Sequence, residues 1–194
     1  MANPSPLQYG QYYHIYNRGN NRECIFVEER NYRYFLKLYA QHVEPIVDTF
    51  AYCLLPNHFH FLVRVKELSE LPGRLPKPSQ CFSNLFNAYT RAFNKSYKRT
   101  GTLFQRPFGR MIVASDTYFV CLVAYIHHNP QRHGLVSDFR VWPYSSYHTY
   151  LSDKPTRLCR DDALAWFNGR KGFIEAHHYE ANTALPASLV PIDD

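Results

Sequence analysis

Two histidines, His58 and His60, are separated by one residue within an apolar segment of the chain. In a β-strand the side chains at i and i+2 project from the same face, so the two imidazoles would lie side by side, opposite Phe59 and Phe61. Two neutral imidazoles in this arrangement can hold one metal ion. In a chain with ten histidines an H-x-H pair arises by chance about half the time. Two packed core histidines are therefore the alternative.

A second group with chemical potential follows about 65 residues later. Tyr125 and Asn129 are one helical turn apart, and both lie on one flank of an apolar stripe that includes Leu122 and Ile126. A phenol can act as a nucleophile, and a carboxamide oxygen can bind a hard cation. An ordinary tyrosine at the edge of an amphipathic helix is the alternative. Helix geometry does not choose Tyr125 over Tyr118, which shares the flank.

Strands and helices that could position these residues follow from the hydrophobic pattern. Strands are predicted at 12–18, 46–54, 58–65 and 108–113. Helices are predicted around 32–43, across 82–93, and from a cap at Ser115 or Asp116 to the residue before Pro130. The turn Leu55-Pro56-Asn57 would join the second and third strands as an antiparallel pair.

The resulting order β-α-β-β-α-β-α predicts an α+β fold. We expect a ferredoxin-like antiparallel sheet with the helices packed on one face, and with Tyr125 on the third helix. Prolines at 71–79 predict a loop that cannot join the sheet. We assign 1–150 to one domain and 151–194 to a partly ordered C-terminal extension, with 184–194 poorly ordered.

Basic residues are concentrated in one stretch of the chain. Between Glu70 and Asp116 there are eight basic residues and no acidic one, so this stretch carries +8 while the rest sums to −2. Arginine outnumbers lysine by 15 to 7, which favours bidentate recognition of phosphate. We therefore expect a polyanionic partner, and a solvated helix face is the alternative.

Composition excludes several classes of protein. Apolar residues make up 45% and charged residues 20% of the 194 residues, which is typical of a globular domain. The five cysteines include no C-x-x-C pair, so we expect reduced core thiols rather than a zinc finger or a disulfide framework. No apolar run approaches the roughly 18 residues of a membrane span, and no secretory pattern begins the chain. These features predict a cytoplasmic protein with no membrane partner.

Taken together, the motifs resemble a known family. His58-Phe59-His60 on a strand, followed by the run from Tyr125 to Pro130, is similar to the single-tyrosine HUH transposases. The narrower resemblance is to the REP-associated tyrosine transposases, and it spans about residues 9 to 150. Four segments carry it: Leu103-Phe104-Gln105-Arg106, the run from Tyr125 to Pro130, Arg132-His133-Gly134-Leu135-Val136 and Trp142-Pro143-Tyr144-Ser145-Ser146-Tyr147.

The resemblance implies an enzyme that nicks and rejoins single-stranded hairpin DNA from palindromic repeats, in the bacterial nucleoid. Tyr125 would become linked to the 5′ phosphate, with Mg²⁺ or Mn²⁺ held by His58 and His60. Insertion-sequence relatives place a glutamine one turn after the nucleophile, whereas this chain has Asn129, which is one methylene shorter. The resemblance makes Asn129 the third ligand, with His127 and His128 as substitutes. By helix geometry we expect His128 to face solvent or DNA.

DNA contacts can be predicted only by region. The residues expected to meet DNA backbone or bases are Arg106, Arg110, Arg18, Arg22, Asn17, Arg91, Lys95, Lys98 and Arg99. Unpaired bases beside the hairpin could stack on Tyr12, Tyr13 or Tyr16. For Trp142 and Tyr144 we expect packing instead.

Two competing functions remain at this point. One is a hairpin-binding protein that keeps the fold without turnover. The other is a zinc hydrolase, for which the chain lacks H-E-x-x-H and a thiolate cluster. We expect a monomer, and a dimer with exchanged tyrosine helices, as in insertion-sequence relatives, is the alternative.

Overall fold

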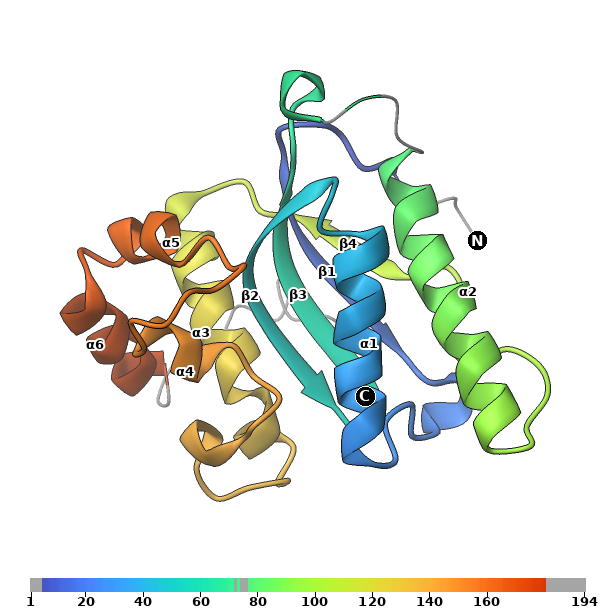
Figure 1. Cartoon of the computed structure of the whole chain (residues 1–194). Coiled ribbons are helices and arrows are strands. Elements are labelled where there is room, and N and C mark those ends of the chain that lie inside the picture. Colours follow the sequence, from blue (N-terminus) through green and yellow to red (C-terminus); the bar gives the residue numbers. More distant parts are fainter. Residues whose placement is uncertain (1–4, 72, 74–76, 181–194) are drawn as a thin grey trace.

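The computed structural model describes residues 5–71, 73 and 77–180. In this part of the chain an antiparallel sheet has the strand order β2-β3-β1-β4 (Figure 1). The strands are β1 (Tyr12–Arg18), β2 (Val47–Leu55), β3 (His58–Val65) and β4 (Gly109–Ile112). The predicted α+β fold with a ferredoxin-like sheet is therefore confirmed.

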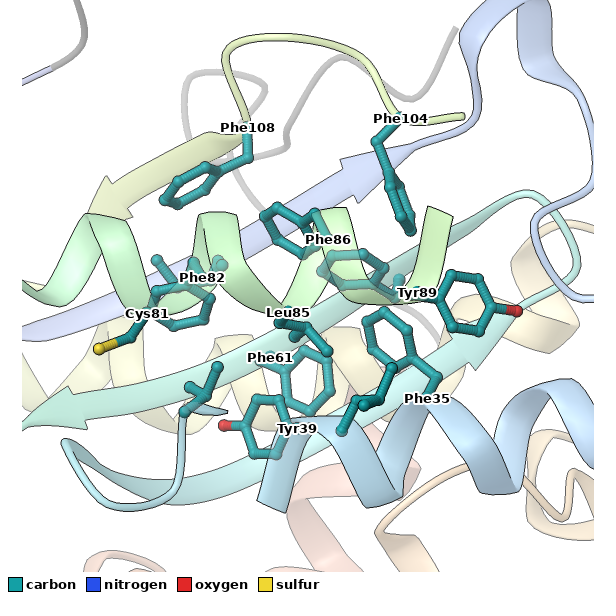
Figure 2. Packing of buried hydrophobic residues seen from close by; sticks show 14 of the residues in the cluster. Phe35, Tyr39, Phe61, Cys81, Phe82, Leu85, Phe86, Tyr89, Phe104 and Phe108 are labelled. Carbon is teal, nitrogen blue, oxygen red and sulfur yellow. The ribbon is translucent and has the colours of Figure 1, made fainter. Parts of the chain in front are cut away.

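One face of the sheet is covered by α1 (Glu29–His42) and α2 (Pro78–Ser96). The alternate residues Phe59 and Phe61 of β3 point to this face, where Phe35 packs against Phe59 at 5.2 Å and Tyr39 stacks on Phe61 at 4.4 Å between ring centroids. Figure 2 shows the continuation of this cluster onto α2, through Phe86 and the residues around it. Burial of these aromatic rings is the main favourable contribution on this face.

The third helix, α3 (Asp116–Arg132), lies on the opposite face of the sheet (Figure 1). Its residues Phe119 and Leu122 pack with Phe50 and Leu62, which belong to a second hydrophobic cluster. The expectation that all three helices share one face is therefore wrong. Strands β2 and β3 are apolar on both faces, so the sheet needs a cover on each side.

Residues after 146 complete the second face. Short helices α4 (Tyr147–Tyr150) and α5 (Arg160–Trp166) and the longer α6 (Arg170–Glu180) follow α3 along the chain. Phe173 is fully buried in the same cluster as α3. Residues 160–166 and 170–180 are thus helical, and residues 184–194 lie outside the described part of the chain.

The ends of α3 explain one difference from the sequence prediction. Ser115 is the N-cap, and its Oγ accepts a hydrogen bond from the Tyr118 amide at 3.2 Å, as predicted. The helix continues through Pro130 to Arg132 instead of ending before the proline. Pro130 lies in the last turn, where its missing amide costs only one helical hydrogen bond and its carbonyl accepts from Leu135 at 2.9 Å.

Shorter elements and the cysteines complete the description. Single 3₁₀ turns occur at Asn20–Arg22, Leu68–Glu70 and Phe139–Val141. The five cysteines, all within the described part, form no disulfide, but Cys24 is exposed and is not the core thiol expected for it. The proline-rich loop at 71–79 is described only at 71, 73 and 77–79, where no strand forms.

No helix among the described residues is long and apolar enough to cross a membrane.

Candidate metal and nucleophile site

His58 and His60 lie side by side on β3, on the face that α3 covers. Their neighbours in register are Arg18 and Tyr16 on β1 and Leu55 and Cys53 on β2. His58 is 5% exposed and His60 is 1% exposed. The alternation of the strand places the pair on one face, as the sequence predicts, and packs them inside the molecule.

The Nδ1 atom of each imidazole contacts a polar neighbour. His58 Nδ1 is 2.6 Å from Asn57 Oδ1, and His60 Nδ1 is 2.9 Å from His14 Nε2. His14, on β1, is fully buried. His14 was not among the site residues predicted from the sequence. Its position two residues before Tyr16 in an alternating strand was the available signal, since it places both side chains on the same face.

Tyr125 and Asn129 reach these histidines from α3. The Tyr125 ring centroid lies 5.8 Å from that of His60 and 6.2 Å from that of His14, edge to face in both cases. Asn129 donates from Nδ2 to the Tyr125 carbonyl at 2.9 Å, which fixes the orientation of its carboxamide. The helix thus brings a phenol and an amide oxygen to the histidine pair, and it is Tyr125 whose ring meets His60.

Asn129 and His58 are neighbours at the centre of this site. The Asn129 carboxamide raises the pKa of His58 against the stronger lowering by burial. Within the described residues, neither His58 Nε2 nor Asn129 Oδ1 has a hydrogen bond of normal geometry, and both atoms are buried. Buried polar atoms of this kind are rare in proteins and are often explained by a missing ion or water.

Burial keeps both imidazoles neutral at neutral pH. It is the largest cause that lowers the pKa of His58, to about 3, and nearby His133 and Arg18 lower it further. Burial also holds the pKa of His60 well below its ordinary value, and His14 adds to this effect. A neutral imidazole is the form that binds a metal ion.

The donor set of the site is two imidazoles and one amide oxygen. Among the described residues, no group of three or more His, Cys, Asp or Glu side chains is placed to hold a metal ion. An ion at this site would therefore need Asn129 as its third protein ligand. The orphaned His58 Nε2 and Asn129 Oδ1 fit that requirement.

Access to Tyr125 is limited. Its side chain is 2% exposed, and the Arg132 guanidinium lies over its ring at 5.2 Å from the centroid. A ligand would therefore reach Tyr125 only between β1, β3 and α3, or after a movement of α3.

His127 and His128 belong to a different environment. His127 contacts His177 through Nδ1 at 2.8 Å and Ser146 through Nε2 at 2.7 Å, and His128 Nε2 donates to the His177 carbonyl at 2.9 Å. Both are buried beneath α6 and are not substitute ligands beside His58. The expectation that His128 faces solvent or DNA is wrong, because α6 covers that side of α3.

A groove leads away from the histidines toward α2. A cavity of about 170 Å³ is lined by His58, His60, Tyr16 and Arg18, and a neighbouring cavity of about 300 Å³ runs between α2 and the segment 102–108. The two cavities share Asn17, Gln105 and Pro107 as lining residues. The two cavities therefore adjoin at these three residues and are together called the groove.

Gly109 controls the approach of Tyr16 to this groove. A Cβ at Gly109 would lie 2.2 Å from the Tyr16 ring, so the glycine lets that ring lie over β4. Tyr16 in turn stacks near His60 at 6.2 Å between centroids. A side chain at 109 would push the Tyr16 ring out of this position.

Two of the predicted DNA-binding arginines line the larger cavity. Arg106 is exposed and lies 3.4 Å from Asn87 Oδ1. Arg110 is half-buried over the Phe108 ring at 3.9 Å, and burial lowers its pKa. Arg18 lines the histidine cavity, so these three cations follow the groove.

The other predicted DNA contacts are more dispersed. Asn17 is buried, and its side chain binds the Gln105 carbonyl at 3.2 Å and the Arg18 amide at 2.8 Å, so it holds the groove in shape. Arg22 is exposed at the 3₁₀ turn that follows β1. Arg99 forms a salt bridge with Glu23 at 2.5 Å. Arg91 and Lys95 are exposed on α2, and Lys98 is exposed in the turn that follows it.

Of the three tyrosines considered for base stacking, only Tyr16 lines the groove. Tyr13 is 6% exposed in the core on the α1 and α2 face, and Tyr12 packs against Phe50 and Phe119. Base stacking on Tyr13 is therefore excluded by burial.

Trp142 and Tyr144 pack against the body of the protein, as predicted. Trp142 donates to the Leu54 carbonyl at 2.9 Å, and Tyr144 stacks on Tyr32 at 3.6 Å between ring centroids.

Comparisons with known proteins agree with the resemblance seen in the sequence. No family model matches the chain. A protein of Haemophilus influenzae, named as a candidate REP-associated tyrosine transposase, is 32% identical over 105 residues, which is 52% of this chain and 59% of that protein. The chain thus aligns with little more than half the length of this curated relative.

Among solved structures, a REP-associated tyrosine transposase bound to a REP hairpin aligns with a TM-score of 0.63 and 18% sequence identity. The alignment covers 80% of this chain and 88% of that structure. At this identity the match establishes the fold. The predicted resemblance to REP-associated tyrosine transposases is confirmed by the curated relative, and the solved structure confirms the fold.

Proposed function

We propose that this protein nicks single-stranded hairpin DNA and transfers the strand through a 5′-phosphotyrosine on Tyr125, with Mg²⁺ or Mn²⁺ as cofactor. The observation that carries the proposal is the Tyr125 ring packed against His60, in a buried site that also holds His58 Nε2 and Asn129 Oδ1. The substrate class is supported by the relative named as a REP-associated tyrosine transposase and by the fold match to one bound to a REP hairpin.

His58, His60 and Asn129 are the residues that would hold the divalent ion. When bound there, the ion supplies Lewis-acid polarisation of a phosphate oxygen and a fixed position for the reacting group. The imidazoles suit Mn²⁺, and the amide oxygen suits either cation.

Tyr125 supplies the nucleophile. Its Oη forms a bond to phosphorus as the bond from phosphorus to the 3′ oxygen breaks, the phenolic proton is lost, and the departing oxygen takes up a proton to become a 3′ hydroxyl. The reverse attack by a 3′ hydroxyl on the phosphotyrosine rejoins the strand and releases the phenol. One phosphoester replaces another of similar energy, so no nucleotide cofactor is required.

The groove provides a path for the substrate. A phosphate in the smaller cavity would meet Arg18 and the two histidines, and the strand would continue past Arg106 and Arg110 in the larger cavity. Arginine pairs with phosphate through parallel hydrogen bonds, which positions the backbone without reading its sequence.

A single chain contains all of the residues that the proposal uses. Tyr125 packs against His60 of its own sheet, so no exchange of α3 between subunits is needed. This arrangement supports a monomer. Light scattering after size exclusion, with and without hairpin DNA, measures the state directly.

A second function, hairpin binding without turnover, is favoured by one observation. Tyr125 is 2% exposed, and a nucleophile that stays buried cannot reach a phosphate. This function would keep the groove and its arginines while the site stays inert.

One experiment separates the two functions. Single-stranded hairpin DNA with unpaired flanks is incubated with the protein and Mn²⁺ or Mg²⁺, and products are separated under denaturing conditions. We expect a covalent adduct for the wild type, none for Tyr125→Phe, and an unchanged adduct for the matched control Tyr118→Phe. Absence of the adduct in the wild type, with DNA binding intact, would support the second function.

A further inference from the structure

Each of the two strand histidines is held at Nδ1 by a side chain outside the proposed ligand set. Asn57 Oδ1 lies 2.6 Å from His58 Nδ1, and His14 Nε2 lies 2.9 Å from His60 Nδ1. In a neutral imidazole one ring nitrogen carries the proton and the other carries a lone pair. The partner at Nδ1 therefore decides what Nε2 can do.

The Asn57 side-chain oxygen faces His58 Nδ1. Because a carboxamide oxygen accepts, His58 Nδ1 donates to it in the Nδ1–H tautomer, which leaves the lone pair on Nε2. Nε2 is buried, has no hydrogen bond of normal geometry within the described residues, and lies beside the Asn129 carboxamide. The nitrogen that could bind an ion is thus the one that faces the third candidate ligand.

The side chain and the main chain of Asn57 make separate hydrogen bonds. Its main-chain carbonyl accepts from the Gly19 amide at 2.8 Å and ties the turn before β3 to the end of β1. The side chain is half-buried and contacts His58. A substitution at 57 can therefore remove the side-chain oxygen while the turn keeps its main-chain hydrogen bond.

We propose that Asn57 is a positioning residue for the metal site: its side-chain oxygen fixes His58 as the Nδ1–H tautomer and aims Nε2 at Asn129. The inference rests on the proposed function. His14 takes the equivalent place for His60, where it would accept the Nδ1 proton whenever Nε2 of His60 binds an ion. Such outer partners of metal-binding histidines set the tautomer and orient the ring.

The test compares Asn57→Ala, which removes the acceptor, with Asn57→Asp, which keeps an oxygen at the same distance from the backbone. The tautomer of His58 is read from long-range ¹⁵N–¹H NMR correlations in metal-free protein labelled at histidine. The affinity for Mn²⁺ is measured by calorimetry without DNA.

We expect the Nδ1–H tautomer of His58 in the wild type. In Asn57→Ala the Nε2–H tautomer should appear and the Mn²⁺ affinity should fall about 10- to 100-fold. Asn57→Asp should restore both readings. Thermal unfolding of each variant identifies any loss of fold, and if Asn57→Ala does not fold, the wild-type tautomer and the aspartate variant still decide the matter.

Two results would overturn the inference: the Nε2–H tautomer of His58 in the wild type, or a folded Asn57→Ala that binds Mn²⁺ as tightly as the wild type. Failure of the proposed function gives a different pattern. If the wild type binds no Mn²⁺, the proposed metal cofactor is contradicted. The His58 tautomer in metal-free protein still tests the role of Asn57.

Discussion

The helix α3 presents buried polar residues to two neighbours, and the two groups differ in how their hydrogen bonds are satisfied. Toward α6, His127 has a partner at each ring nitrogen, His177 at one and Ser146 at the other. Toward β3, His58 Nε2 and Asn129 Oδ1 lie beside each other, and neither atom has a hydrogen bond of normal geometry among the described residues.

This difference separates a structural group from a candidate binding site. A hydrogen-bonded buried histidine stabilises the fold, whereas an unsatisfied buried nitrogen costs free energy. A bound ligand that contacts this nitrogen would offset the cost. Burial alone does not make the distinction, since His127 and Asn129 are both at most 1% exposed.

Replacing one histidine of each group gives the largest expected contrast. His58→Ala should slow adduct formation at least about 100-fold, because it removes one of the proposed ligands of the divalent ion. The free energy of unfolding should fall by about 1–2 kcal/mol, because removal of the unsatisfied Nε2 offsets part of the cavity left by this buried ring. Adduct gels and urea unfolding give the two values.

The matched variant is His127→Ala. It opens a cavity and removes one hydrogen-bond partner from each of His177 and Ser146, so the free energy of unfolding should fall by about 3 kcal/mol. Adduct formation by the protein that remains folded should persist. Equal losses of stability in the two variants would contradict the comparison.

Acid should destabilise the group beneath α6. Burial lowers the pKa of His177 from 6.5 to about 3, so between these values the unfolded chain binds a proton that the folded chain does not. The free energy of unfolding therefore falls as the pH drops below 6.5, and for His177 alone the loss from pH 7 to pH 5 is about 2 kcal/mol. Urea unfolding of the wild type and of His177→Phe at both pH values checks this, with a smaller loss expected in the variant. An unchanged loss would remove His177 as a cause.

Substitution of Asn129 tests the group that faces β3, with a smaller expected effect. Asn129→Ala should weaken Mn²⁺ binding on the order of tenfold, because one oxygen donor is lost while both imidazoles stay. Asn129→Asp keeps an oxygen and serves as the control. Calorimetry on protein without DNA gives both affinities, and an alanine variant that binds Mn²⁺ normally would show that Asn129 is not a ligand.

The smallest expected effect concerns the groove. Arg106→Ala should weaken hairpin binding a few-fold and lower the slope of log affinity against log salt by about 0.7, the value for one phosphate contact on single strands. Arg33 is the control, because it is exposed on α1 and already pairs with Glu29. Binding isotherms at several salt concentrations measure the slopes. Equal changes of the salt slope in the Arg106 and Arg33 variants would show that DNA does not bind along the groove.

Much of the site was predictable because short-range periodicity determines it. The alternation of β3 puts His58 and His60 on one face, and its predicted bounds, 58–65, agree with the structure. The helical angle between Tyr125 and Asn129 places both on one flank of α3, and the structure confirms that they face the same neighbours.

Long-range packing determined what the sequence could not show. Strands β2 and β3 are apolar on both sides, so their sequence pattern does not show which face of the sheet α3 covers. The buried residues of this region are divided between the end of α5, where Phe167 follows the helix, and α6, which carries Phe173 and His177. They give no single helical stripe in the sequence, so the cover over His128 was missed. His14 was missed because its value comes from its contact with His60 across the sheet.

The most direct test of the site is the position of the covalent bond. After reaction with hairpin DNA and Mn²⁺, nuclease-trimmed protein is digested and the nucleotide-bearing peptide is sequenced by mass spectrometry. The account predicts one modified residue, Tyr125, formed only when Mn²⁺ or Mg²⁺ is present. Modification of a different tyrosine, or an equal yield in the presence of a chelator, would contradict it.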